Sequence, residues 1–209
     1  MTQTDYGPDV CYSAPVARNG PQSVHTKGNT MTAIATALPA GVYKDDGVHS
    51  NAGFAVKHML ATFRGSFPKF SAELNVDDDG RATLVGTVPV SGVAVKDENL
   101  VAHLQSPDFF DAEQHPEIRF ESSDIVVDGP NVTITGDLTI KGHTERVTAK
   151  GSVVGPIEDP FGNTKLGLQL ETVVDRTNFG LNWNAPLPKG GFMLADDVTL
   201  TVDLELLKG

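Results

Sequence analysis

The stretch Val132–Lys141, VTITGDLTIK, alternates apolar and polar side chains almost without a break. Val132, Ile134, Leu138 and Ile140 share one face, and the threonine, aspartate and lysine side chains take the other. A period of two sustained over a whole segment is typical of a β-strand with one buried face. This stretch therefore predicts a half-buried strand.

The same rhythm recurs along the chain from about residue 42 onward. At the C-terminus, apolar side chains occupy every second position from Val198 to Leu206. Further strands are expected at 54–59, 63–67, 70–76, 82–90, 118–127, 146–154 and around 166–170. About eight or nine strands joined in series are typical of an all-β, antiparallel barrel.

The connections between the predicted strands are of two kinds. Asp77–Gly80 and Asp128–Asn131 are short, and their Asp, Asn and Gly residues tolerate tight-turn backbone angles, which predicts antiparallel hairpins. The longer connection after residue 90 breaks the β rhythm. There Asp97 is placed to cap a short helix that carries Leu100 and Leu104,. We expect this helical excursion to cap one end of the barrel.

The composition of the chain narrows its partners. It has 209 residues, a net charge of −11 and one cysteine, Cys11. An acidic surface repels the phosphates of DNA and RNA, so no nucleic-acid partner is expected. A lone cysteine excludes an internal disulfide. No apolar run approaches the roughly 18 residues of a membrane span, so none is predicted.

Residues 1–40 differ in composition from the rest. They are rich in glycine, proline and small polar side chains and lack apolar periodicity, which predicts a disordered leader ahead of a barrel domain at 41–209. We see no apolar segment between a basic start and a cleavage site, and we therefore expect a cytoplasmic protein without a signal peptide. Met31 is an alternative start. Homodimer formation is left open.

Catalytic and metal-binding motifs are missing. The sequence contains no G-x-S-x-G, phosphate-binding loop, dinucleotide fingerprint or H-E-x-x-H,. Its six histidines never stand two or four residues apart, the spacing of local metal sites,. The sequence thus predicts no enzyme, no metal and no cofactor other than a carried ligand.

Four blocks, in order and with similar gaps, resemble the YceI-like family over about 41–209. They are His49–Phe67, His103–Phe120, Gly136–Gly142 and Arg176–Trp183. The resemblance implies an extended lipocalin-like barrel whose apolar tube binds polyisoprenoid chains, including isoprenoid quinones and polyprenyl diphosphates. It also implies export for many members, which are periplasmic. The chain departs from the family at Asn178, where an aspartate is common.

The residues and the resemblance together suggest a polar head site at one mouth. Arg176 is the first candidate, because a guanidinium matches phosphate geometry. His49, Ser50, His58 and Asn178 lie in the same family blocks and are expected to assist. The alternative interpretation is that Arg176 pairs with an acidic neighbour while His49 and His58 support hairpin backbone.

A second set of residues is expected to line the apolar pocket. This set is Phe54, Val56, Gly86, Ile134, Gly136, Leu138, Leu168, Phe179 and Trp183. Glycine inside a strand marks either a barrel bend or the close approach of a ligand. The sequence thus predicts binding, storage or transport of a long-chain isoprenoid lipid. The alternatives are a stress-related interaction protein with a filled barrel and, less favoured, an enzyme acting on isoprenoid lipids.

Overall fold

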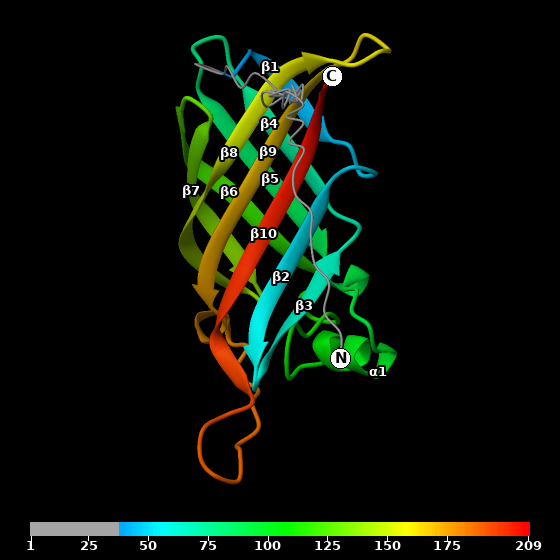
Figure 1. The fold of residues 1–209 in the computed structure, drawn as a ribbon, viewed down its shortest axis with the longest axis vertical. Helices are drawn as coiled ribbons and strands as arrows, with labels where there is room; N and C mark the ends of the chain where they lie inside the picture. Colours follow the sequence, from blue (N-terminus) through cyan, green and yellow to red (C-terminus); the bar gives the residue numbers. More distant parts are fainter. Residues whose placement is uncertain (1–37) are drawn as a thin grey trace, which may run out of the picture. The chain divides into compact units, whose positions relative to one another are not determined.

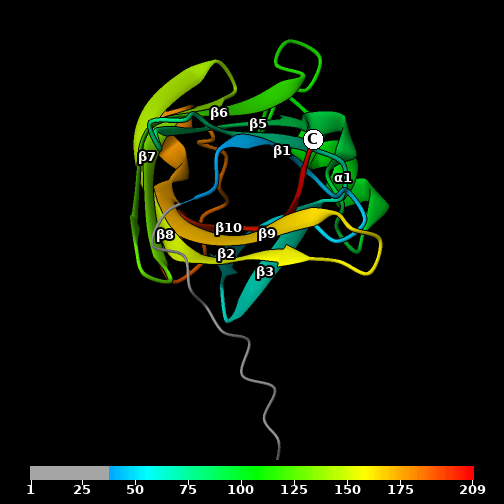
Figure 2. The same cartoon turned by 90° about the horizontal axis from the view of Figure 1, so that it is seen from above.

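The computed structural model describes residues 38–209, so most of the predicted leader at 1–40 lies outside the described residues. Eight antiparallel strands close into a barrel (Figures 1 and 2). Strand β1 closes it, because β1 pairs with β4 on one side and with β10 on the other. In ring order the strands are β1 (Gly41–Asp45), β4 (Ser71–Val76), β5 (Ala82–Pro89), β6 (Glu117–Asp128), β7 (Asn131–Ile140), β8 (His143–Glu158), β9 (Thr164–Asp175) and β10 (Leu194–Lys208).

A hairpin of two further strands extends the barrel wall at one end. It consists of β2 (Asn51–His58) and β3 (Ala61–Phe67). β1 pairs with β10 at 206–208, and β2 pairs with β10 at 194–203, so the two strands follow one another along the same edge. Beyond its partner β2, β3 has only a bridge from Ser66 to Ala94 within the described chain.

The predicted helical excursion is confirmed. Helix α1 (Glu98–Gln105) lies between β5 and β6 in the chain and stands at the side of the barrel beside β3, so it completes the wall there and does not cover the end (Figures 1 and 2). The Asp97 side chain accepts a hydrogen bond from the Leu100 amide at 3.1 Å, which satisfies one of the free N–H groups of the first turn,. Leu100 and Leu104 then face the barrel interior.

The barrel interior is filled over one half and hollow over the other. We call the filled part the closed half. One buried apolar cluster fills it, and its most buried members, each at most 1% exposed, are Tyr43, Ile134, Leu166 and Leu206. The void left among them is about 10 Å³, at the lower limit for one water molecule. We call the other part of the interior the hollow half. The closed half blocks its inner end, so a molecule that enters the hollow half cannot pass through the barrel.

Gly136 explains one break in the strand pattern. It faces the bulge of β6 between Ser122 and Asp124. A Cβ atom at Gly136 would collide with the Glu121 carbonyl and the Phe120 ring. Gly136 is therefore required because the neighbouring strand approaches closely at the bulge. Of the two reasons for a glycine within a strand, a bend of the barrel applies here and a ligand does not.

Candidate functional site

The hollow half contains a cavity of about 700 Å³, within the roughly 300–1,000 Å³ range of small-molecule sites. Leu84 and Leu204 belong both to the filled cluster and to the cavity lining, so they form its floor. At the other end the lining reaches His58 and Ala61 of the β2–β3 hairpin and Leu194 at the start of β10. The cavity is a pocket closed at one end.

Aromatic rings make up one wall of the cavity. Phe54 of β2 lies 5.8 Å from Phe67 of β3, and Phe67 lies 6.0 Å from Phe110 after helix α1 (ring centroids). The sequence can form this wall because the β2–β3 hairpin leaves β3 without a further full strand partner, and α1 and its flanking turns pack there instead. Apolar ring faces suit a hydrocarbon chain.

A second aromatic group lies in the lining near helix α1. The His103 ring stands edge-on to Trp183 at 4.8 Å and to Phe109 at 5.0 Å. Its Nε2 lies 3.2 Å from a carboxylate oxygen of Asp108, which orients the imidazole. Here the cavity offers flat π-surfaces and one imidazole, which suit an aromatic or weakly polar group.

Gly86 leaves open space in the cavity wall. A Cβ atom there would have one neighbour within 4 Å, the Ser71 carbonyl oxygen at 3.9 Å. Gly86 therefore differs from Gly136: no neighbouring atom requires its lack of a side chain, but the cavity gains volume from it. Ala52, Ala72 and Ala149 are further small residues of the lining.

Arg176 borders the cavity, but four of its five N–H donors are already used,. It is 5% exposed and starts the short 3₁₀ helix η2 (Arg176–Phe179). Its Nε donates to Ala195 O at 3.0 Å, and its terminal nitrogens donate to the carbonyls of Leu181 and Trp183 and, at 2.9 Å, to the Asp196 carboxylate. The geometry matches the alternative interpretation, pairing with an acidic neighbour, and leaves no free guanidinium edge for a phosphate.

Most of the predicted lining residues lie in the cavity wall. These six are Phe54, Val56, Gly86, Leu138, Phe179 and Trp183. Ile134 and Leu168 point inward as expected but pack into the closed half, so their prediction as cavity lining is wrong. Gly136 is also absent from the wall, because it serves the β6 bulge.

The predicted head-group residues do not meet. His58 lines the cavity at the end of β2, whereas Asn178 is exposed on η2 outside the lining. His49 and Ser50 lie in the closed half near Glu205. Glu205 and the Arg176 partner Asp196 are nine residues apart on β10, or roughly 30 Å along a strand,. The prediction that His49 and Ser50 assist Arg176 is wrong.

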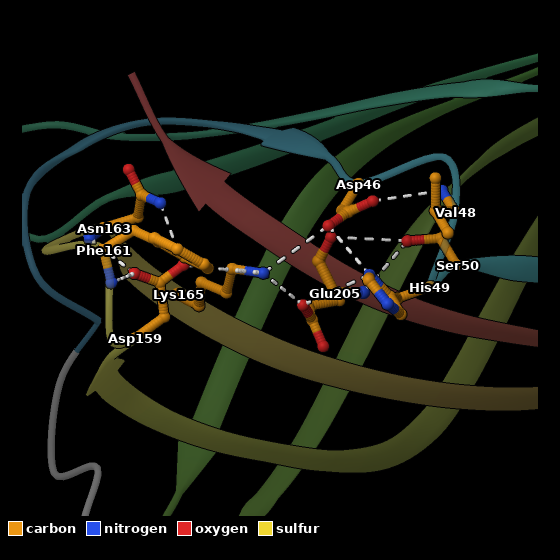
Figure 3. A network of polar contacts seen from close by, with 9 residues as sticks. All are labelled: Asp46, Val48, His49, Ser50, Asp159, Phe161, Asn163, Lys165 and Glu205. Carbon is orange, nitrogen blue, oxygen red and sulfur yellow. Dashed lines mark hydrogen bonds and ion pairs between the residues drawn. The ribbon is translucent and has the colours of Figure 1, made fainter.

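The closed half carries its own polar cluster, which sequence analysis did not anticipate (Figure 3). Lys165 Nζ contacts the carboxylates of Glu205 at 2.5 Å and Asp46 at 3.5 Å, and His49 Nδ1 lies 2.9 Å from Asp46. The Ser50 hydroxyl accepts from Glu205 N at 3.0 Å and so ties the start of β2 to β10. These contacts fasten the strand ends where β1 gives way to β2.

Three groups in this cluster have the donor atoms of a metal site. The ligand atoms of Asp46, His49 and Glu205 lie within 4.8 Å of one another. However, the ammonium of Lys165 contacts both carboxylates and supplies the balancing positive charge. The arrangement is that of an ion-pair cluster.

The cluster makes the folding stability of the protein depend on pH. Hydrogen bonds, first from His49 and then from the Val48 amide, lower the pKa of Asp46 from 3.8 to about 2. Because the pKa of Asp46 is lower in the folded than in the unfolded protein, its carboxylate stabilises the folded state at pH values above the unfolded pKa of 3.8. This contribution is lost as the pH falls toward 2,. In urea titrations we expect Asp46→Asn to be less stable than the wild type above about pH 4, with the difference vanishing near pH 2. A difference that stays constant over this range would contradict the assignment.

No helix among residues 38–209 has the length and apolar character needed to cross a bilayer.

Comparison with known proteins places this barrel in context. A family model described as the YceI-like domain matches residues 43–206. The UPF0312 protein SA2479 of Staphylococcus aureus is 33% identical over 164 residues, which cover 77% of this chain and 94% of that protein. Burkholderia cenocepacia BcnA has a solved structure that is 26% identical, with a TM-score of 0.66, and covers 79% of this chain and 99% of its own.

A more distant structural neighbour shares the fold alone. It is a polyisoprenoid binding domain from Saccharophagus degradans, implicated in plant cell wall breakdown. It is 10% identical, with a TM-score of 0.60, and the match covers 82% of this chain and all of that domain. The barrel architecture is therefore kept at very low sequence identity.

Proposed function

This chain belongs to the YceI-like domain family, and on that premise we propose that it binds a long isoprenoid chain in its hollow half for storage or transport. The observation that carries the proposal is a cavity of about 700 Å³ with an apolar wall and a closed floor. The ligand class of the Saccharophagus degradans domain, polyisoprenoid, supports the same assignment. The filled-barrel alternative describes only the closed half.

The shape of the cavity supports an extended guest. On β10 the lining runs from Leu194 to Leu204, ten residues or about 33 Å along the strand. Burial of roughly 400 Å² of apolar surface contributes on the order of 10 kcal/mol before the ordering costs of binding. A hydrocarbon chain therefore binds here without strong polar contacts.

The direction of binding follows from the floor. Because Leu84 and Leu204 close the cavity at mid-barrel, the tail of the guest points toward them and its head remains on the side of His58, His103 and Trp183. A polar head placed at the floor would lose its water contacts without compensation. The chain thus enters tail first.

The residues of the lining favour a neutral head over a diphosphate. Among residues 38–209, Arg176 is the single arginine or lysine in the lining, and four of its five donors are taken by backbone carbonyls and Asp196. A diphosphate would then be desolvated without a paired cation, which is costly. Trp183, Phe109 and His103 offer stacking surfaces and one imidazole instead. We therefore assign the head to the isoprenoid quinone type.

Trp183 gives a direct test, because it is the chain's one tryptophan and it lines the cavity. We expect an isoprenoid quinone to quench Trp183 fluorescence to saturation at one molecule per chain. A polyprenyl diphosphate of equal chain length should compete at least tenfold more weakly. Absence of saturable quenching would contradict the binding proposal, and equal competition by the diphosphate would contradict the choice of head group.

A further inference from the structure

The turn between β2 and β3 presents two large apolar side chains to solvent. His58 pairs with Ala61, so Met59 and Leu60 form a two-residue hairpin turn. Met59 is 53% exposed and Leu60 is fully exposed. Met59 has φ +47°, in the left-handed region where glycine or asparagine is favoured,. The turn thus combines an unfavourable backbone conformation with unfavourable exposure, and neither helps the fold.

A third exposed apolar side chain lies beside this turn. Phe192 is 64% exposed and belongs to the connection before β10, which meets the β2–β3 hairpin at the same end of the barrel (Figure 1). The Met59 amide donates to the Met193 carbonyl at 2.8 Å, which holds the two segments together. We call Met59, Leu60 and Phe192 the apolar rim.

The apolar rim continues directly into the cavity. His58 and Ala61, the immediate neighbours of Met59 and Leu60, are cavity-lining residues. Met193, which follows Phe192, also lines the cavity. An exposed apolar surface that joins an apolar interior marks an interaction site and not a random surface feature.

The charges around the apolar rim are mixed in sign, in a chain whose net charge is −11. Lys57 precedes the turn on β2, and Lys189 lies in the connection that carries Phe192; both are exposed. Of the nearby carboxylates, Asp196 is paired with Arg176 at 2.9 Å, and Asp197 is the next along β10.

We propose that the apolar rim docks on a lipid bilayer, so that the guest chain passes between bilayer and cavity without crossing water. This inference rests on the proposed function, because it supplies the source of a water-insoluble ligand. The occupant of the rim is the headgroup and upper acyl region of a bilayer, with Leu60 and Phe192 inserted, and the docking rests on apolar contact and not on net charge,.

The test uses flotation of the full chain with phosphatidylcholine vesicles, with and without phosphatidylglycerol. The variant carries Met59→Gly, Leu60→Ser and Phe192→Ser, and Gly at position 59 suits the positive φ,. We expect vesicle affinity to fall at least tenfold. The matched control is Phe161→Ser, an 89% exposed phenylalanine in the β8–β9 turn of the closed half, which should bind as the wild type does.

Two further measurements separate the causes of a negative result. Thermal melting should show the rim variant folded and no less stable than the wild type. Quinone added from ethanol should quench Trp183 equally in both, because the cavity is unchanged. If the wild type binds quinone but not vesicles, or if the rim variant binds vesicles normally, bilayer docking is overturned while the proposed function stands. Loss of quinone binding in the wild type itself would overturn both.

Discussion

Replacing Gly86 with phenylalanine is expected to abolish ligand loading while the barrel stays folded. A Cβ at Gly86 has open space around it, with its nearest neighbour at 3.9 Å, and no unusual φ is required there. The ring would project into the cavity between floor and mouth and occupy volume that the guest needs. We expect the affinity for an isoprenoid quinone to fall at least a hundredfold, about 2.7 kcal/mol or more.

The measurement is saturable quenching of Trp183 fluorescence, with thermal melting as the check on folding. Thr83→Phe is the matched control, because Thr83 is an exposed residue on the outer face of the same strand. It should bind quinone as the wild type does. If Gly86→Phe loads ligand normally while folded, the hollow half is not the binding site.

Replacing Arg176 with methionine is expected to cost about 4 kcal/mol of folding free energy. The side chain is buried and bonds three backbone carbonyls and Asp196. Methionine fills similar space but leaves three carbonyl acceptors without donors, one buried and two partly buried, and each buried acceptor costs about 1–3 kcal/mol,. Urea unfolding should therefore show a large fall in the midpoint.

Asp196→Asn distinguishes the backbone contacts from the ion pair. The Asp196 side chain is 58% exposed, so its loss should cost at most about 1 kcal/mol. Quinone affinity of the folded Arg176→Met protein should change less than tenfold, because Arg176 orders the backbone and does not bind the head. If Arg176→Met were as stable as the wild type but no longer bound an anionic isoprenoid, Arg176 would be a head-group ligand and this account of it would be wrong.

The alternation of residues predicted the architecture well, for a physical reason. A buried face imposes a period of two, so segments such as Val132–Ile140 and Val198–Leu206 could be recognised as strands,. Strand β1 was missed because it is five residues long and turns only one fully buried side chain, Tyr43, inward. The helix cap at Asp97 was also readable, since capping is a local interaction,.

The position of a residue along the barrel axis could not be read from the same pattern. Ile134 and Leu138 share a face of β7, yet Ile134 packs in the closed half and Leu138 lines the cavity. Alternation states which face a side chain takes but not its height, which depends on strand stagger and on what fills each layer.

Sequence blocks were also a poor guide to proximity at the site. His49 and Arg176 both fall in family-like blocks, yet they lie at opposite halves of the barrel. His103 and Trp183 belong to different blocks but touch. Spacing in the sequence predicts neither the separation of the first pair nor the contact of the second. A long strand spans much of the barrel, so residues of one sequence block can lie far from those of another.

Electron density in a crystal of gently purified protein, read along the barrel axis, tests the account most directly. We expect continuous elongated density in the hollow half, from the level of His103 and Trp183 down to Leu84 and Leu204, and ending there. A hollow half that has collapsed on its own side chains, or that holds only separate water peaks after saturation with isoprenoid quinone, would contradict it.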